Sequence, residues 1–211
     1  MKHLTSAIVF SAALLAGGCA STGYDKAGDT SDSLQKASRA IAKSDVQIDK
    51  TLLSLSDLVN NPNANLESQF KRFSSEVSKL ESLENEVIKN SETMQKEGAA
   101  YFQKWDLEVA KIHNEKIRSR STERKNTVAH HFDNVRVSYV QAQSDFKPFM
   151  SDLKDIRTAL SADLTVGGIN AVRTVAGKAH EEAFPLKTTL HSLSGDFKAL
   201  GISLSSASGQ N

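Results

Sequence analysis

A short basic stretch is the part of the chain with residues best suited to binding anions. Residues 111–125, KIHNEKIRSRSTERK, contain six Lys or Arg residues against two Glu residues, whereas the whole chain has a net charge of only +1. Such a local excess of positive charge favours contact with lipid phosphates, an acidic polymer or an acidic protein face. The alternative is a solvated turn that binds nothing. The candidate anion-binding residues are Lys111, Lys116, Arg118, Arg120, Arg124 and Lys125.

The single cysteine, Cys19, follows a segment with the features of an export signal. A short basic start precedes 13 apolar or small residues at positions 4–16, a run too short to span a bilayer comfortably. The residues LAGGCAS at positions 15–21 resemble the bacterial lipobox, although alanine stands where leucine is commoner, three before the cysteine. In proteins of that class the signal is cut before the cysteine, which is then acylated on its thiol and amino group. We predict a signal peptide over residues 1–18 and lipidation of Cys19; the alternative is an ordinary signal peptide cut near Ala20.

Acylation of Cys19 would hold the chain on a membrane. Palmitate-type acyl chains contribute about 0.8 kcal/mol for each buried CH2 group, and several chains together give stable anchoring. The next residue is Ala20 rather than aspartate, which by resemblance to the sorting rule of enteric bacteria favours the outer membrane. We expect residues 19–30, rich in Ser, Thr, Gly and Asp, to form the acylated cysteine and a flexible tether, with the chain facing the periplasm.

Other chemically capable residues give weaker signals. Tyr101 and Trp105 are candidates to line a groove for an apolar ligand, although aromatic residues at helical spacing more often belong to a core. His130 and His131 are adjacent, and neighbouring residues on a helix point about 100° apart, so they are poorly placed to share a metal ion. The sequence offers no catalytic triad pattern and no cofactor motif. We expect no enzymatic activity, no metal and no cofactor.

Long helices must position these residues. From Leu66 to Ile112, alternate steps of four and three residues meet an apolar residue at ten of fourteen positions, with polar residues between them. That spacing predicts a long helix packed along its length against other helices. The seam fades after Ile112 and returns in a shifted phase at Val128. We therefore expect the chain to reverse near residues 119–126, in the basic stretch; a single helix through this region is the alternative.

Three further helices complete the predicted architecture. Apolar seams indicate helices over residues 31–60, 128–160 and 172–200, and a turn with a Gly-Gly pair is expected at residues 163–170. Pro148 and Pro185 lie within two of these seams and would bend or interrupt them. The predicted fold class is all-α: an elongated antiparallel helical bundle or coiled coil of about four long helices over residues 31–203, followed by a polar tail at residues 204–211. Because the apolar seams are narrow, a second copy of the chain is a further candidate to complete them, as a homodimer.

Two stretches, together with the lipobox, carry a resemblance to a known family. They are WDLEVAKIHNEKIRSRS at residues 105–121 and DFKPFMSDLKDIRTALSADLT at residues 145–165. With these residues the chain resembles a family of uncharacterised Gram-negative lipoproteins catalogued as a domain of unknown function, over nearly the whole mature chain. The resemblance implies a proteobacterial envelope protein. It implies no catalytic or binding residues.

The balance of charge limits the partners. Removal of residues 1–18 takes away one of 26 basic residues and none of 25 acidic residues, which leaves 25 of each. A neutral chain has no overall attraction to nucleic acid. We expect a non-enzymatic lipoprotein, held by its acyl chains, that acts as a scaffold or interaction module for an envelope protein or an anionic lipid. The alternative is a carrier of a lipid or other small ligand between the helices near Trp105.

Overall fold

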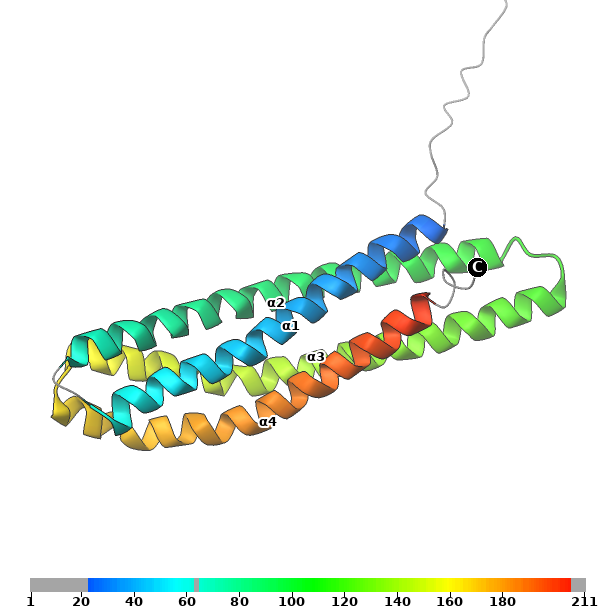
Figure 1. Ribbon diagram of the computed structural model, residues 1–211. Helices are drawn as coiled ribbons and strands as arrows, with labels where there is room; N and C mark the ends of the chain where they lie inside the picture. Colours follow the sequence, from blue (N-terminus) through cyan, green and yellow to red (C-terminus); the bar gives the residue numbers. More distant parts are fainter. Residues whose placement is uncertain (1–22, 63–64, 206–211) are drawn as a thin grey trace, which may run out of the picture.

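The fold is a long antiparallel bundle of four helices (Figure 1). A computed structural model describes residues 23–62 and 65–205, and within these ranges there is no strand. Each helix packs against two neighbours, α1 and α3 both contacting α2 and α4. The predicted fold class is confirmed. The helices are α1 (Gly23–Asn60), α2 (Leu66–Val109), α3 (Glu115–Ala162) and α4 (Val166–Ser205).

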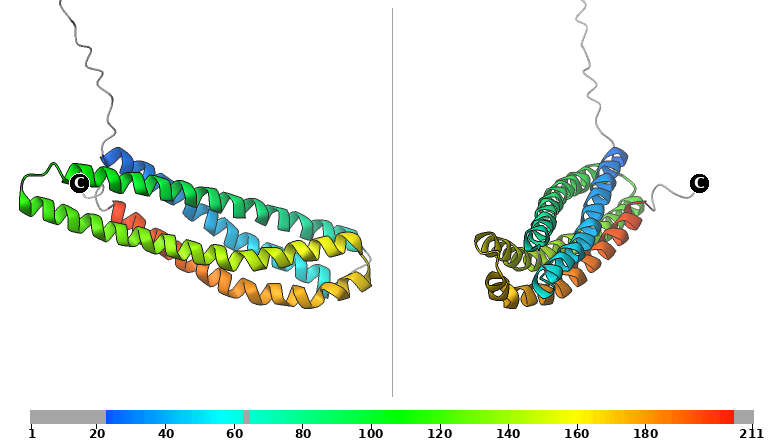
Figure 2. Two further views of the ribbon diagram at one scale, coloured as in Figure 1. Left: turned by 180° about the vertical axis from the view of Figure 1, so that it is seen from behind. Right: turned by 60° about the vertical axis from the view of Figure 1, so that its left-hand side comes forward.

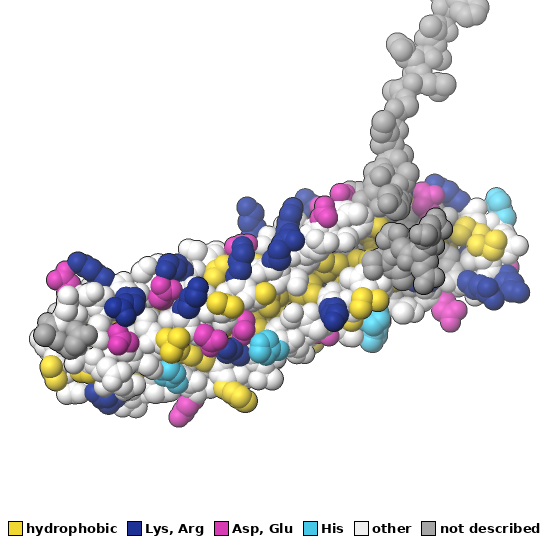
Figure 3. Space-filling model, viewed as in Figure 1, with side chains coloured by type: hydrophobic (Ala, Val, Ile, Leu, Met, Phe, Trp, Pro, Cys, Tyr) yellow, Lys and Arg dark blue, Asp and Glu magenta, His cyan; other side chains and the backbone are white. Residues whose placement is uncertain are grey.

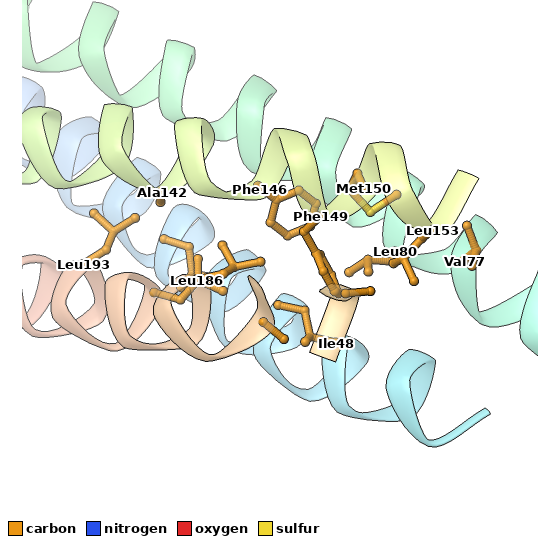
Figure 4. Close-up of a cluster of buried hydrophobic side chains, with 14 of the residues drawn as sticks. Ile48, Val77, Leu80, Ala142, Phe146, Phe149, Met150, Leu153, Leu186 and Leu193 are labelled. Atoms are coloured by element: carbon orange, nitrogen blue, oxygen red, sulfur yellow. The ribbon is translucent and has the colours of Figure 1, made fainter. Parts of the chain in front are cut away.

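The apolar seams face the interior of the bundle, as predicted. Every position of the series from Leu66 to Ile112 is buried or half-buried, and the ten seam positions from Val128 to Leu160 are all buried. All four helices contribute to the centre of the core (Figure 4). Fully burying one such side chain stabilises the fold by about 1.5–3 kcal/mol. The central side chains include Ile48 of α1, Leu80 of α2, Phe149 and Leu153 of α3, and Leu186 of α4.

Charged side chains along the flanks fix the register between neighbouring helices. Arg157 of α3 donates to Glu81 of α2, with 2.9 Å between Nη1 and Oε2. Lys187 of α4 lies 2.6 Å from a carboxylate oxygen of Asp49 on α1. Because both pairs join residues far apart in the sequence, they favour one alignment of each helix pair over its slipped alternatives.

The first helix begins earlier than the sequence suggested. We expected a tether up to residue 30 and a helix from residue 31, but α1 already begins at Gly23. Thr30 and Leu34 are buried, at 1% and 3% exposure, so packing extends the helix back through a segment of low helix propensity. The predicted signal peptide, Cys19 and the first part of the tether lie outside the described residues. At the other end α4 continues to Ser205, and residues 206–211 of the predicted tail also lie outside them.

The expected reversal at residues 119–126 is wrong, because these residues lie inside α3. The turn between α2 and α3 comes earlier, over residues 110–114. Asn114 caps α3, its Oδ1 accepting a hydrogen bond from the backbone N–H of Ile117 at 3.1 Å. No described residue has a positive φ, so the turn requires no glycine. This explains why neither glycine nor proline marks it.

The turn between α3 and α4 is also shorter than expected. It spans residues 163–165, and the Gly-Gly pair lies in the first turn of α4. The hydroxyl of Thr165 accepts a hydrogen bond from the N–H of Gly168 at 3.2 Å. A Cβ at Gly168 would lie 2.0 Å from the carbonyl oxygen of Asp163, so any other residue at this position would force the backbone of the turn to shift.

Both prolines lie inside continuous helices. Pro148 is within α3 and Pro185 within α4, and neither ends its helix. Both are exposed, so water can solvate the carbonyl groups that lose a hydrogen bond at these positions.

Candidate anion-binding tip

The α2–α3 turn and the helix ends beside it project from the end of the rod at which α1 begins (Figures 1 and 2). We call residues 105–125 the tip. The Thr30 hydroxyl donates to the carbonyl of Glu97 at 3.5 Å, so Gly23, seven residues earlier in the antiparallel α1, lies beside a position near Lys104. The helix α2 continues to Val109, about 8 Å further at 1.5 Å per residue. The outermost part of the tip therefore consists of two helices and their turn.

The six predicted anion-binding residues do not form one open patch. Lys111 lies 3.0 Å from Glu108, and Arg118 pairs with Glu115 one turn away. These pairs neutralise part of the positive charge, and the hydrogen bonds from Lys111 and Lys104 hold the pKa of Glu108 below its usual value.

Two more of the six residues make contacts between helices. Lys125 lies 2.5 Å from Asp106 across the α2–α3 pair. Arg124 donates to the backbone carbonyl of Ser203 near the end of α4, at 3.0 Å. A cation near a helix C-terminus interacts favourably with the helix dipole, so this contact fits the end of α4.

Lys116 and Arg120 are the two members of the set that remain available. Both are exposed and lie four residues apart on α3, which places them on the same face one turn apart. Within residues 23–62 and 65–205, neither side chain makes an ion pair or a side-chain hydrogen bond. The structure therefore reduces the predicted patch of six to a pair of open cations on a framework of paired ones.

The aromatic residues of the predicted ligand groove pack between α2 and α3 at the base of the tip. Tyr101 and Trp105 are half-buried, with ring centroids 5.3 Å apart, and the indole N–H of Trp105 donates to Ser121 Oγ at 3.1 Å. Burial raises the pKa of Tyr101. These contacts hold α2 against α3 below the turn, which is a structural role.

Close packing continues below these rings. Phe132 of α3 meets Phe102 of α2 edge-on, with centroids 5.6 Å apart. Its ring occupies the space beside Gly98, where a Cβ would lie 2.1 Å from Phe132 Cζ. A glycine in the middle of an apolar seam was the one sequence signal for this close approach.

An open depression on the α3 side of the tip was missed by the sequence analysis. It has a volume of about 820 Å³ and includes Arg118, Thr122, His130 and His131 in its lining. The two imidazole rings are 6.2 Å apart and inclined by 81°, so they do not face a common point. Among the described residues, no group of three or more His, Cys, Asp or Glu side chains is placed to hold a metal ion.

The bundle interior is nearly filled. A cavity of about 30 Å³ lies between the helices, lined by Val87, Tyr139, Phe146 and Leu190 among others. That is the room of about one water molecule. Glu84 lies at this cavity, and burial raises the pKa of its carboxyl group.

One pair of side chains resembles part of a hydrolytic site. Ser56 Oγ of α1 and His180 Nε2 of α4 are 3.0 Å apart, and burial lowers the pKa of His180. A catalytic arrangement would need an acid that orients the imidazole. No carboxylate of the described residues hydrogen-bonds to His180, so the pair serves as a contact between the two helices.

No helix in the described part of the chain combines the length and apolar character needed to cross a bilayer. Comparisons with curated proteins and with solved structures gave no match. One family model matches residues 17–192 of the 211, which is most of the chain. The chain belongs to the family described as protein of unknown function, DUF2959.

Proposed function

We propose that this protein is a lipid-anchored, non-enzymatic scaffold or interaction module at the outer membrane, facing the periplasm. The lipobox-like residues 15–21 place the proposed acylation site, Cys19, only four residues before the first residue of α1. An anchor at this position would hold a rigid rod by one end. Envelope proteins would then bind its sides or its tip.

The observation that carries this proposal is the filled interior of the bundle. The seams of all four helices meet in one core, and the cavity between them has room for about one water molecule. Ligand pockets for small molecules are typically about 300–1,000 Å³. A bundle without an interior pocket of that size has its outer surface, including the open depression at the tip, left for binding, which favours macromolecular partners.

The rival proposal is a carrier of a lipid or small apolar ligand. It would require α2 and α3 to separate, because Trp105 is engaged with Tyr101 and Ser121. Adding a lipid extract to the purified protein distinguishes the two. A saturable change in Trp105 fluorescence would favour the carrier, whereas an unchanged spectrum would favour the interaction module.

The proposal is tested in cells that produce the full chain. Mass spectrometry of the mature protein should find acyl groups on Cys19, and the Cys19→Ser variant should leave the membrane fraction. Photocross-linking residues placed on exposed positions of α1 and α4 should then give a discrete protein adduct. A Cys19→Ser variant that stays in the membrane fraction would contradict the anchor, and only diffuse adducts at every position would contradict the interaction module.

A further inference from the structure

The geometry points to the tip as a membrane-docking element: we infer that Lys116, Ile117 and Arg120 bind the surface of a bilayer containing anionic lipids, beside the acyl anchor. This inference rests on the proposed acylation of Cys19. It adds a second contact with the membrane, and it fixes which end and which helix pair of the rod face the lipid.

The length of chain between the anchor and α1 brings the tip to the membrane. Cys19 and Gly23 are separated by four residue steps, which span at most about 14 Å whatever their conformation. The α2–α3 hairpin projects from that same end, and α2 alone continues about 8 Å past the start of α1. An acyl chain inserted in a bilayer would therefore hold the tip within reach of the lipid headgroups.

The tip carries both kinds of side chain that a membrane surface binds. Ile117 is 57% exposed, although it is a large apolar residue, and it lies between the open cations Lys116 and Arg120 in sequence. Apolar and basic side chains gather at this end of the molecule (Figure 3). An apolar residue that enters the headgroup region beside cations that meet phosphates is the pattern of interfacial binding.

The net positive charge of the tip favours a bilayer surface that contains anionic lipids. Its six basic residues face four acidic ones, Asp106, Glu108, Glu115 and Glu123, which leaves a net charge of +2. Three of the acids are paired with basic side chains, so they add little repulsion. Among the six basic residues, Lys116 and Arg120 are the two whose charges remain open to solvent, since Arg124 donates to the carbonyl of Ser203.

The acylated full chain supplies the first test. Since Cys19 is the single cysteine and its thiol would be acylated, Ile117→Cys provides one labelling site for an environment-sensitive fluorophore. The control is Phe184→Cys on α4, at a position that is 78% exposed. In vesicles of phosphatidylglycerol and phosphatidylcholine, spin-labelled lipid should quench the label at position 117 and not the label at 184. Equal quenching at the two positions, or none at 117, would overturn the inference.

The unacylated chain supplies the second test, which does not depend on the anchor. In the Cys19→Ser background, the double variant Lys116→Gln with Arg120→Gln should bind the same vesicles about thirty-fold more weakly. The loss is expected because the variant removes the attraction of two basic residues to an anionic surface. Lys50→Gln with Lys147→Gln removes the same charge from exposed positions outside the tip and should have little effect. Equal losses in the two double variants would overturn the inference.

The two tests also separate this inference from the proposed function. If the mature protein from cells carried no acyl groups on Cys19 but vesicle binding still depended on Lys116 and Arg120, the anchor would be wrong and the docking element would stand. An acylated chain whose tip stays out of the lipid would remove the docking element alone. A protein adduct in place of a lipid adduct, from a photocross-linker at position 117, would also overturn docking on lipid.

Discussion

Two glycines of α4 should respond in opposite ways to the same substitution. Alanine is favoured over glycine within a helix by about 1 kcal/mol. At Gly177, where nothing lies within 4 Å of an added Cβ, the Gly177→Ala variant should gain this amount. At Gly168 the Cβ would lie 2.0 Å from the backbone oxygen of Asp163 and 3.1 Å from its carbonyl carbon. The obstacle is backbone, so the α3–α4 turn itself must move.

The net effect at Gly168 is a balance of these two terms. Overpacking typically costs about 1–3 kcal/mol, and a neighbour that is backbone, which moves only with the turn, places this site in the upper part of that range. After the gain in helix propensity, Gly168→Ala should lose about 1–2 kcal/mol of unfolding free energy. For a chain of this size, that corresponds to a fall in Tm of about 2–8 °C, against a rise of about 2–4 °C for Gly177→Ala.

Urea and thermal unfolding followed by far-ultraviolet circular dichroism would measure both variants. Gly167→Ala is the neighbouring control, because its Cβ would meet only the Thr165 hydroxyl, at an ordinary 3.4 Å. It should therefore be neutral or slightly stabilising. If Gly168→Ala were as stable as the parent chain, the close approach at this turn would not exist and the argument would be refuted.

Three further predictions concern the core, an interhelical ion pair and the tip. Phe149→Ala should cost about 3–5 kcal/mol in urea unfolding, because Phe149 is fully buried among all four helices. The hydrogen bond from Arg157 lowers the pKa of Glu81 from 4.5, so this pair stabilises the fold above pH 4.5, and the contribution is lost as the pH falls through the folded-state pKa. The Glu81→Gln variant should therefore show a flatter pH dependence of Tm below about pH 4.5. An unchanged acid profile would contradict the pairing. Ser121→Ala should move the fluorescence of Trp105 to longer wavelength, as water replaces the hydroxyl, and should change stability by about 1 kcal/mol or less; an identical spectrum would place the indole elsewhere.

The sequence was sufficient to predict the helices and their buried faces. Apolar residues that recur at alternate steps of four and three residues indicate both a helix and its buried side, because this spacing matches the period of the helix. That is why the series from Leu66 to Ile112 and from Val128 to Leu160 are buried or half-buried without exception. The prolines within the seams, Pro148 and Pro185, were less informative, because an exposed proline can lie within a helix that tertiary packing holds together.

The helix ends and the contacts across helices were harder to predict. The start of α1 depends on the burial of Thr30 and Leu34 against a helix that comes later in the chain. The pair between Lys125 and Asp106 joins residues 19 positions apart, and it forms only once the turn has set the register of α2 against α3. Local sequence contains no record of that register.

The position of the turn decides which cations of the basic stretch are open. Had the chain reversed at residues 119–126, Lys116 would lie near the end of the preceding helix and Arg120 would lie in the turn. With Asn114 as the cap, Lys116 and Arg120 instead lie one turn apart on the first two turns of α3. Arg118, between them in sequence, forms an ion pair with Glu115. A single asparagine side chain, which accepts one backbone hydrogen bond, thus places the two open cations on a common face. Asn114→Ala should accordingly cost about 1 kcal/mol and loosen this face before it affects the rest of the rod, which hydrogen exchange at the first turn of α3 would detect.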